Sequence, residues 1–544
     1  MADPFFITTA IDYTNGAPHI GHAYEKVLAD VLARYHRLKG DDVFFLTGVD
    51  QHGQKVQQSA EKQGIPPQQF VDGVTAKFVA LWEKLNVRYD SWAATTAPSH
   101  KECVRAILQR LCDDKGPDGQ SRFIYKKSQG GYYSVRQEQF LTDKERGEDG
   151  EFGPEWQPVE FREEENYFFR LLEQKQWLLN LIDARSAAGR PLVIPDFRVA
   201  ELRNAVERLE GDLCITRPKS RLSWGIEVPF DPQYVTFVWF DALVNYISFA
   251  PGYDPAPTRP PEAFLHHWRG ILHVIGKDIL IPAHGVYWPI MLKALGFTDE
   301  EIPTLLVHGW WNIRSKSGES EKMSKTLGNV VDPDVLADKY GAEAVRYYLM
   351  SDIATGKDAD FSEERLVQRF NTDLANSLGN LLNRTLNMAA KYRTGKLTRA
   401  IDLATLPRDV SRLSPTFSGI EYFTAMTDYQ PSVACQIALG IATVCNQYID
   451  EMRPWALAKD PSQADELDAV LYQLAESLRI LAILISPVLP KAAHGIFDQL
   501  NWKMDLSGND ARFRLEDAQW GGLLDGHQLG QPTPLFPRIE APPE

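Results

Sequence analysis

The sequence predicts an α/β protein with a doubly wound parallel sheet, an inserted domain and a separate α-helical domain in its last third. Three observations lead to this prediction. A β-rich run at 5–9, a helical pattern at 23–38 and an apolar run at 43–46 follow one another in the order of a βαβ unit. Clusters of Gly, Ser, Asp and Glu interrupt the pattern from about 115 to 229. Beyond 371 the apolar residues recur mostly at helical spacing.

The first fifty residues give the clearest βαβ pattern. An Asn-Gly pair at 15–16 marks a turn after the first strand, and Gly40 is expected to end the helix. The buried stripe of this helix is expected to consist of Val27, Leu28, Val31, Leu32 and Tyr35. Strand-like runs return at 234–240 and at 271–275. Because βαβ units build parallel sheets that helices cover, we expect a Rossmann-like domain.

Composition limits the class of protein. With 544 residues, 44% of them hydrophobic, the chain can form more than one domain with a core. It has no run near the roughly 18 apolar residues of a membrane span and no basic leader, so we expect a cytoplasmic protein and no membrane. The five cysteines form no CxxC pair, which favours reduced thiols. The net charge of −15 argues against polyanion binding over the whole surface, but permits a local groove for RNA.

Residues 19–22, with the sequence HIGH, lie at the turn that enters the first helix. Backbone N–H groups and the helix dipole favour anions at such a turn, and the imidazoles of His19 and His22 can donate to phosphate oxygens. Gly21 would permit close approach of a ligand. The alternative is that the two histidines only cap and pack a surface turn.

Residues 322–326, with the sequence KMSKT, form a second candidate phosphate site. Ser-Gly precedes them at 317–318 and Leu-Gly-Asn follows at 327–329, so we expect a flexible loop. Lys322 and Lys325 are mobile point charges that can close on phosphates. Taken alone, such a pair is more often a solvated basic loop. The presence of both motifs in one chain favours phosphate chemistry.

The two motifs resemble the HIGH and KMSKS signatures of the class I aminoacyl-tRNA synthetases, and the chain is similar in particular to the bacterial methionyl-tRNA synthetases. The resemblance runs nearly from end to end. Apart from the two motifs, it is carried by the segments 15–18 (NGAP), 47–53 (TGVDQHG), 165–169 (ENYFF), 238–242 (VWFDA), 276–279 (GKDI), 454–455 (PW) and 535–540 (LFPRIE).

The resemblance implies four regions. A Rossmann catalytic domain would comprise 1–115 and 230–309, with a connective insertion domain at 116–229. A region that carries the KMSKS loop and contacts the tRNA stem would follow at 310–370. An α-helical anticodon-binding domain would comprise 371–544.

Inside this last region, two apolar stripes predict helices. One stripe consists of Leu374, Leu378, Leu381 and Leu382. The other runs from 471 to 485, and the Pro-rich stretch 532–543 is expected to form a strap or tail.

The resemblance also implies roles for matching residues. ATP would be bound by His19, Gly21, His22, Glu227, Gly276, Asp278, Lys322 and Lys325. Adenylate formation would be catalysed by His19, His22, Arg217, Lys322 and Lys325. Arg221 lies close enough to leave the register of Arg217 open. Methionine would be bound by Asp50, through its ammonium group, and by a wall that consists of Ile11, Tyr13, Trp239, Leu243, Tyr246, Ile279 and His284. The tRNA anticodon would be read by Asn380, Arg384 and Trp455.

These residue types suit these roles. A thioether is polarisable and favours aromatic contact, and Tyr and His offer weak donors to sulfur. An unstacked base can lie on Trp455 while Asn380 and Arg384 bond base edges. Taken one at a time, the aromatic residues of the methionine wall are more often ordinary core, and the same alternative holds for Trp455.

Two departures from the family pattern matter. The positions aligned with the zinc-knuckle ligands of many relatives hold Ser134, Gln137, Phe152 and Glu155. These residues cannot form a tetrahedral thiolate site, so we predict no zinc and no other dedicated metal site. The stretch 276–288 is one residue longer than in the family, which leaves the register of His284 open.

As a whole, the resemblance implies a methionine–tRNA ligase that uses ATP with Mg²⁺, forms methionyl-adenylate and charges tRNA(Met) for initiation and elongation. We expect a monomer, because no appended tRNA-binding module follows 537–540. Two alternatives stay open. One is a class I synthetase for valine, isoleucine or leucine, although an insertion of roughly 115 residues leaves no obvious room for the editing domain of those relatives. The other is a catalytically silent paralogue, against which the intact Asp50 and both motifs weigh.

Overall fold

The computed structural model describes residues 2–135, 139–141, 143–147, 149–237, 239–314, 320–323, 330–399, 413 and 419–540. Its centre is a seven-stranded parallel sheet with the order β2-β3-β1-β13-β14-β8, in which β4 pairs with β3. The strands are β1 Pro4–Thr9, β2 Asp12–Tyr13, β3 Asp42–Asp50, β4 Ser91–Ala94, β8 Val193–Ile194, β13 Leu272–Gly276 and β14 Thr304–His308. The predicted doubly wound sheet is confirmed.

Helix α1, Ile20–Lys39, connects β2 to β3 and packs on the sheet. The predicted stripe lies against this core, since its four aliphatic side chains are fully buried and Tyr35 is 3% exposed. The helix ends at Gly40, whose φ of 93° is left-handed and therefore favours glycine. The other helices around the sheet are α2 Gln54–Gln63, α3 Pro67–Lys84, α4 Pro98–Asp113, α7 Trp239–Ser248, α8 Glu262–Trp268 and α9 Trp288–Ala294.

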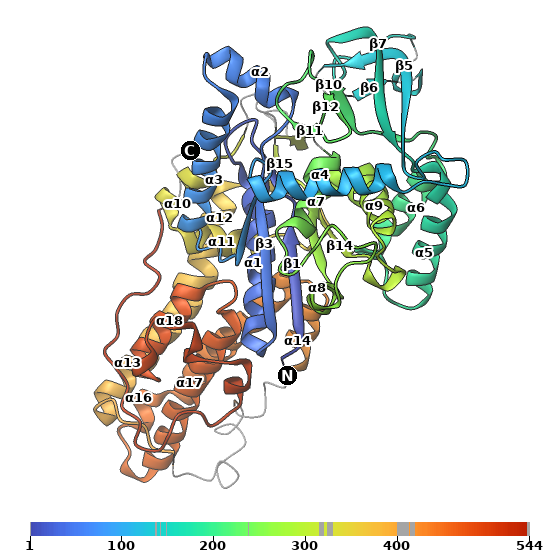
Figure 1. Cartoon of the computed structure of the whole chain (residues 1–544). Helices are drawn as coiled ribbons and strands as arrows, with labels where there is room; N and C mark the ends of the chain where they lie inside the picture. The colour runs from blue at the N-terminus through green and yellow to red at the C-terminus, as the bar shows by residue number, and fades with distance from the viewer. Residues whose placement is uncertain are drawn as a thin grey trace.

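The inserted segment forms two small sheets at the top of the molecule as drawn in Figure 1. Their strand orders are β6-β5-β7-β9 and β10-β12-β11. The strands are β5 Ile124–Ser134, β6 Gln139–Leu141, β7 Val159–Phe169, β9 Leu213–Cys214, β10 Thr216–Pro218, β11 Ile226–Val228 and β12 Asp231–Thr236. The same segment supplies α5 Lys175–Ala187, α6 Val199–Glu207 and the edge strand β8 of the central sheet. The domain boundaries given above stay predictions.

The single strand predicted at 234–240 is wrong. Strand β12 ends at Thr236 and pairs antiparallel with β10 and β11, and helix α7 begins at Trp239. Helix α7 buries every residue from Phe240 to Ile247. A helix that is apolar on nearly all sides cannot be distinguished from a buried strand over a few residues, which explains the error.

After β14, a three-stranded sheet with the order β16-β15-β17 and three helices lead to the C-terminal part. These elements are β15 Trp311–Arg314, β16 Ser320–Lys322, α10 Pro333–Tyr340, α11 Ala342–Ser351, β17 Ala359–Phe361 and α12 Glu363–Arg369. Of the KMSKT motif, only Met323 and the backbone of Lys322 belong to the described residues. Lys325 lies outside them.

The C-terminal part is helical, as predicted, and lies at the lower left in Figure 1. Its elements are the π-helical segment Phe370–Gly379, α13 Asn380–Arg393, α14 Ile420–Thr427, α15 Pro431–Met452, α16 Pro454–Leu457, α17 Ala464–Ile485 and α18 Pro490–Gln499. All four leucines of the first predicted stripe are at most 1% exposed. In the Pro-rich stretch, the backbone of Ile539 exchanges two hydrogen bonds with the Asn371 amide, at 2.8 and 2.9 Å, which favours a strap over a tail at this residue.

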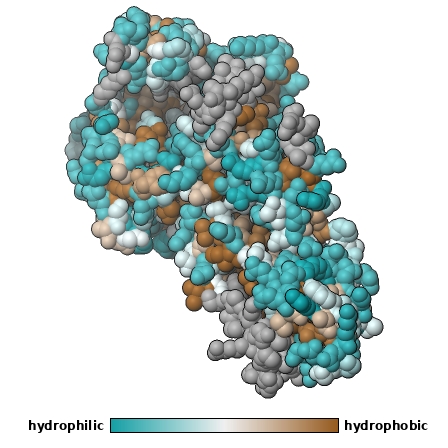
Figure 2. All heavy atoms as spheres, turned by 180° about the vertical axis from the view of Figure 1, so that it is seen from behind, coloured by the Kyte–Doolittle hydropathy of each residue, from teal (hydrophilic) through white to brown (hydrophobic). Residues whose placement is uncertain are grey.

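One stretch of the described chain, Pro431–Leu457, is long and apolar enough by length and composition to cross a membrane. In the structure its main helix, α15, packs against α14, α17 and α11. Its apolar side chains Ala434, Leu439, Ala442 and Ile449 are buried there. Figure 2 shows hydrophobic residues scattered among hydrophilic ones on the face seen from behind. The apolar face of α15 therefore belongs to a protein core.

Arg346 joins the helical part to the central sheet. Its side chain is fully buried on α11, and Nη1 lies 2.7 Å from Asp30 Oδ2 on α1. Nε and Nη2 each donate at 2.9 Å to backbone carbonyls, those of Val488 and Pro487, in the turn between α17 and α18. Nη1 also donates to the Leu85 carbonyl at 3.1 Å. One guanidinium therefore connects three parts of the chain.

Replacing Arg346 with Leu should lower the free energy of unfolding by about 3–5 kcal/mol, because removing one partner of a buried pair leaves the other without compensation. Urea unfolding followed by circular dichroism measures this. The matched control is Arg37→Leu, which removes a partly exposed pair with Asp90 and should cost less than about 1 kcal/mol. Equal losses in the two variants would contradict the assigned role of Arg346.

Candidate active site

A cavity of about 850 Å³ opens at the carboxyl edge of the central sheet. Ala10 after β1, Asp50 at the end of β3, Gly276 at the end of β13 and His308 at the end of β14 all line it. Doubly wound sheets bind their ligands at this edge. The predicted site residues that line the cavity are Ile11, Tyr13, His19, Gly21, His22, Asp50, Arg217, Trp239, Leu243, Tyr246, Gly276, Asp278, Ile279 and His284.

The two histidines of the HIGH motif form the start of α1. Nδ1 of His19 accepts from the backbone N–H of Gly21, and Nδ1 of His22 accepts from the backbone N–H of His19, both at 3.1 Å. Their rings stack with centroids 3.7 Å apart. Because both Nδ1 atoms accept, each neutral ring carries its proton on Nε2, where it can donate to an anion. Capping the helix and binding phosphate are therefore compatible roles.

The structure gives a second reason for a glycine at position 21, besides the close approach of a ligand. A Cβ at this position would lie 3.0–3.1 Å from the ring of His19. The missing side chain thus makes room for the capping imidazole as well as for a ligand. Gly276 is similar, because a Cβ there would lie 2.7 Å from Asp278 Oδ1.

The aromatic wall is built around Tyr246. His284 donates from Nδ1 to the Ile279 carbonyl at 3.0 Å, so its Nε2 accepts from the Tyr246 hydroxyl at 2.7 Å. Burial lowers the pKa of His284 to about 4, which keeps the ring neutral near pH 7. His284 lies in the segment Leu280–Tyr287, which is kinked by non-helical backbone at Ile281, and it lines the cavity. The longer spacing in this stretch therefore does not remove His284 from the cavity.

A second neutral histidine supports Tyr246 from behind. The ring of His273 stacks on Tyr246 with centroids 4.1 Å apart. Its Nε2 accepts from the Trp288 indole at 3.0 Å, so Nδ1 donates to the Thr8 hydroxyl at 2.7 Å. Burial, and then the neighbouring His284, lower the pKa of His273 well below its usual value.

Asp50 lines the same cavity and is 6% exposed. It pairs in register with Tyr13 of β2. Its Oδ1 lies 3.4 Å from both the backbone nitrogen of His52 and the hydroxyl of Thr95. The cavity thus combines the Asp50 carboxylate with an apolar and aromatic wall, which suits an ammonium group on an uncharged side chain.

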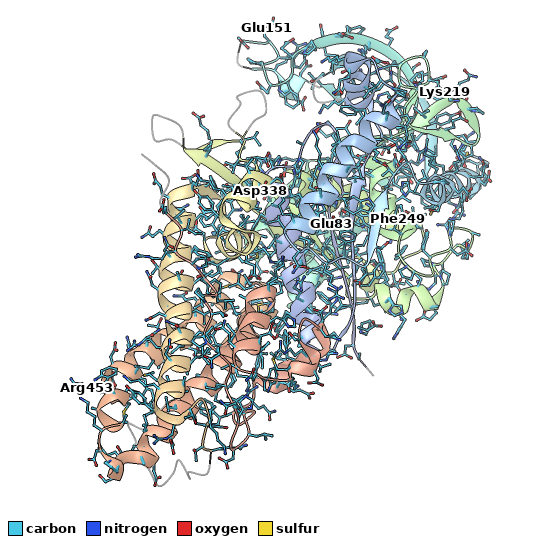
Figure 3. The ribbon with its side chains drawn as sticks, turned by 90° about the vertical axis from the view of Figure 1, so that its left-hand side faces the viewer. Glu83, Glu151, Lys219, Phe249, Asp338 and Arg453 are labelled. Carbon is cyan, nitrogen blue, oxygen red and sulfur yellow. The ribbon has the colours of Figure 1, made fainter. Side chains whose placement is uncertain are left out.

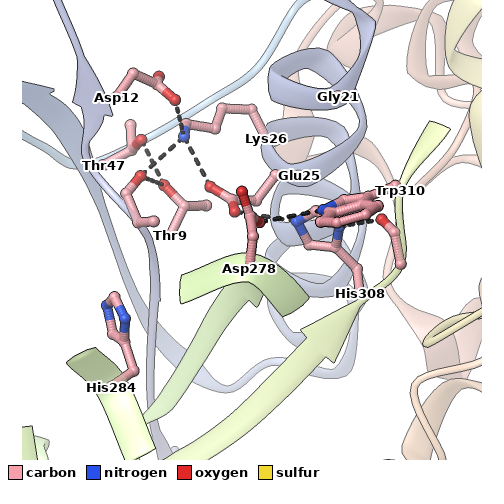
Figure 4. A network of polar contacts seen from close by, with 12 residues as sticks. Thr9, Asp12, Gly21, Glu25, Lys26, Thr47, Asp278, His284, His308 and Trp310 are labelled. Carbon is pink, nitrogen blue, oxygen red and sulfur yellow. Dashed lines mark hydrogen bonds and ion pairs between the residues drawn. The ribbon is translucent and has the colours of Figure 1, made fainter. Parts of the chain in front are cut away.

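A buried network that the sequence analysis missed lies between α1 and the neighbouring strands (Figure 4). Lys26 Nζ lies 2.7 Å from Asp12 Oδ1 and 2.8 Å from Glu25 Oε1. The other oxygen of Glu25 accepts from His308 Nε2 at 3.0 Å. Asp12, Glu25 and His308 line the cavity. The sequence signal was available, since Glu25 and Lys26 are charged residues in an otherwise apolar stretch of the helix.

On the nucleotide side, Asp278 accepts from the Trp310 indole at 3.3 Å. Lys277 lies over the Trp310 ring, 3.9 Å from its centroid, and pairs with Asp358 at 2.6 Å. Trp310 also lines the cavity and was not predicted. Figure 4 shows Asp278 and Trp310 beside Glu25.

The structure distinguishes between Arg217 and Arg221 as the candidate arginine of the cavity. Arg217 is 5% exposed, lines the cavity and donates from Nη1 to the Thr216 carbonyl at 2.7 Å. Arg221 instead pairs with Glu164 at 2.5 Å and lies over the Tyr133 ring. The geometry therefore favours Arg217 as the arginine of the cavity.

Glu227 is not brought to the cavity, contrary to its assignment as an ATP ligand. It lies on β11 and pairs with Lys219 at the surface. The reason is the fold of 226–236, which forms a separate antiparallel sheet instead of an edge of the central one. Lys322 is placed only by its backbone, whereas Met323 lines the cavity.

The residues at the zinc-knuckle positions do not fit a metal. Ser134 is buried and donates to the Trp156 carbonyl at 2.5 Å. The ring of Phe152 lies 4.3 Å from the guanidinium carbon of Arg146, so a cation is already present there. Gln137 lies outside the described residues. Among those described, we find no group of three or more His, Cys, Asp and Glu arranged to hold a metal.

The predicted anticodon readers lie on the helical part. Asn380 is exposed at the start of α13, and Arg384, one turn later, pairs with Asp450 of α15 at 2.6 Å. Trp455 follows α15 and is 42% exposed. An indole that stays this open is available for stacking, which ordinary core packing would not leave.

Comparison with known proteins gives a consistent result. The family described as "tRNA synthetases class I (M)" matches 5–149 and 155–386, and "Anticodon binding domain of methionyl tRNA ligase" matches 419–542. The methionine–tRNA ligase of Thermosynechococcus vestitus is 39% identical and covers 100% of this chain and 99% of the relative. That of Bacillus subtilis is 39% identical and covers 99% of this chain and 78% of the relative.

A solved structure agrees with these relatives. The Mycobacterium tuberculosis methionyl-tRNA synthetase in complex with methionyl-adenylate is 34% identical, with a TM-score of 0.86, over 98% of this chain and 100% of that one. With the HIGH motif at a carboxyl-edge cavity, these matches define a class I aminoacyl-tRNA synthetase. Within that class, the chain belongs to the methionyl-tRNA synthetase family.

Replacing His284 with Asn should make folding less sensitive to acid. The unfolded chain binds a proton at His284 below about pH 6.5, whereas the folded protein does so only near pH 4, so stability falls as the pH drops through this window. Asn keeps a donor for the Ile279 carbonyl but does not titrate. From pH 7 to pH 4.5, the variant should lose about 2–3 kcal/mol less free energy of unfolding than the parent.

Urea unfolding at the two pH values measures this difference. His266→Asn, at an exposed histidine of α8, is the matched control and should behave like the parent. The same acid sensitivity in His284→Asn as in the parent would contradict a neutral, buried His284.

Proposed function

We propose that this chain is a methionine–tRNA ligase. Methionine and ATP give methionyl-adenylate and pyrophosphate, and the terminal ribose of tRNA(Met) then takes the methionyl group for initiation and elongation. The observation that carries the proposal is one cavity that holds the HIGH imidazoles, the Asp50 carboxylate and the neutral wall of Tyr246 and His284. The related structure with methionyl-adenylate bound supports the same chemistry.

Each group of site residues has its own role in this proposal. Asp50 accepts from the substrate ammonium, and the wall surrounds the thioether. His19 and His22 donate from Nε2 to phosphate oxygens, and Arg217, Lys322 and Lys325 stabilise the charge that develops as pyrophosphate leaves. No covalent nucleophile is needed from the chain, because the methionine carboxylate attacks the α-phosphate.

Gly276 and Asp278 would hold the ribose of ATP, and Ile11, Tyr13, Trp239, Leu243 and Ile279 would complete the methionine wall. Mg²⁺ would accompany the triphosphate as its counterion. Zinc has no role in this proposal, because the donor set in the insertion does not suit it.

The tRNA would contact both ends of the molecule. Figure 3 shows Glu151 and Lys219 of the insertion at one end and Arg453, next to Pro454 and Trp455, at the other. Asn380, Arg384 and Trp455 would read the anticodon, while the 3′ end reaches the cavity. We further propose that the enzyme acts as a cytoplasmic monomer without a membrane.

ATP–pyrophosphate exchange across the amino acids tests the function. Exchange should depend on methionine and exceed that with valine, isoleucine or leucine by more than about a hundredfold, since an apolar pocket discriminates by about 10–200-fold per group changed. Preferred exchange with one of the other three would identify a different synthetase. No exchange with any amino acid would identify a catalytically silent paralogue.

Trp455→Ala tests the anticodon role. Loss of one stacked base should lower kcat/KM for charging tRNA(Met) about tenfold to a hundredfold, at 1–3 kcal/mol per stacked base, and leave exchange unchanged. Met504→Ala is the control, because it shortens another half-exposed side chain of the helical part. Normal charging by Trp455→Ala would show that the indole does not read the anticodon.

A further inference from the structure

A buried carboxylate lies behind the cavity and does not line it. Asp241, in the first turn of α7, is 0% exposed and accepts from His52 Nδ1 at 2.7 Å and from His100 Nε2 at 2.8 Å. Both histidines are at most 1% exposed. An apolar side chain of similar size would avoid the free energy of burying a charge. The cluster therefore needs a reason other than core packing.

The two histidines connect α7 to two other elements. His52 follows the end of β3 by two residues, and His100 lies in the first turn of α4. The second ring nitrogen of His100 lies 2.7 Å from the hydroxyl of Ser248, the last residue of α7. His100 thus fixes α7 at both of its ends.

The carboxylate stays ionised in this setting. Burial by itself would raise the pKa of Asp241, but the charge of His52 and the hydrogen bonds from His100 and His52 lower it below the usual value. Lys101 is a further cation near Asp241, and its own pKa is lowered chiefly by burial. Hydrogen bonds to an ionised carboxylate are shorter and stronger than neutral ones, so these contacts hold α7 firmly against the two histidines.

The side chains of helix α7 differ in what they contact. Residues three, four and seven apart share a helix face, whereas residues two apart do not. Trp239, Leu243 and Tyr246 form the face that lines the cavity. Phe240, Ala242 and Asn245 of the same helix also line it, whereas Asp241 and Ser248 do not and instead bond His100 of α4. The position of the cavity wall is therefore set in part by anchors on the same helix that lie outside the cavity.

His52 also reaches the polar side of the cavity. Its backbone nitrogen lies 3.4 Å from Asp50 Oδ1, while its ring bonds Asp241. The ring of Trp224 packs against His52 edge to face at 5.5 Å and limits its movement. A single residue thus connects the Asp50 carboxylate with the helix that carries the wall.

We propose that Asp241, His52 and His100 are positioning residues for the amino-acid substrate, which fix the separation between Asp50 and the wall on α7. The proposal rests on the proposed function of the cavity. None of the three residues lines the cavity, so they act through Asp50 and α7. The proposed nucleotide ligands are built on α1, β13 and β14, and in the described part of the chain the bonds of the three side chains lead to α4, α7 and the end of β3 instead, so the ATP affinity should stay unchanged.

The test compares two substitutions of His52 in the full chain by ATP–pyrophosphate exchange. His52→Asn keeps an N–H donor near the place of Nδ1, and His52→Leu removes it. His52→Leu should raise the methionine KM about tenfold or more, as expected for a lost hydrogen bond to a charged group, and leave the ATP KM within about twofold. His52→Asn should restore the methionine KM to within about threefold of the parent.

His100→Gln and His100→Leu repeat the comparison at Nε2, and they keep the test decisive if a His52 variant does not fold. A normal methionine KM in both leucine variants would overturn the proposal, as would equal rises in the KM values for methionine and ATP. If the parent itself shows no methionine-dependent exchange, the proposed function fails, and the positioning role fails with it. Normal exchange by the parent and by both leucine variants overturns the positioning role alone.

Discussion

The position of the C-terminal helical part relative to the central sheet depends on the buried ion pair between Asp30 and Arg346. Asp30 has no exposure, and its carboxylate also accepts from Arg34 Nε and from the backbone N–H of Arg88, both at 2.8 Å. These contacts lower the pKa of Asp30 in spite of its burial. Because breaking one partner of such a pair is costly, the helical part has one strongly preferred position against α1.

Helix α1 connects the Asp30–Arg346 pair to the cavity. His19 at its N-terminus faces the cavity, Glu25 and Lys26 pair below it, and Asp30 bonds Arg346 further along. At 1.5 Å per residue, roughly 16 Å of continuous helix separates His19 from Asp30. Since each buried charge on the helix is paired, α1 can remain rigid while its two ends contact different domains. The HIGH motif and the Asp30–Arg346 contact between domains therefore lie on one helix.

Local patterns were sufficient to predict the elements whose ends are defined within a few residues. The strand at 5–9, the helix that ends at Gly40 and the HIGH turn at its start follow from periodicity, a left-handed cap and turn residues. Most of the residues that the resemblance supplied for the ATP and methionine sites line the cavity. Glu227 was misplaced because its position depends on which sheet accepts β11, and strand pairing between distant segments leaves no local signal.

Long-range contacts explain the other omissions. Lys26 gains its partner Asp12 only through the packing of α1 on β2, and Asp241 meets His52 and His100 from segments more than a hundred residues away. A single buried acid in an apolar stretch, such as Asp241 in 234–247, signals only that a partner exists. Which partner it has is decided by the tertiary fold.

The cavity is lined by charged side chains in some places and by an uncharged wall at Tyr246. Glu25, Asp278 and Arg217 bring charge to the lining of the cavity, whereas the wall at Tyr246 contains His284 and is backed by His273, two histidines that burial keeps neutral. An imidazolium in that wall would retain water and favour an acidic side chain. A neutral, buried ring offers aromatic and apolar surface without a charge, which suits contact with a thioether better than contact with a carboxylate. Under the proposed function, the burial that keeps His273 and His284 neutral would favour an uncharged amino acid in this pocket.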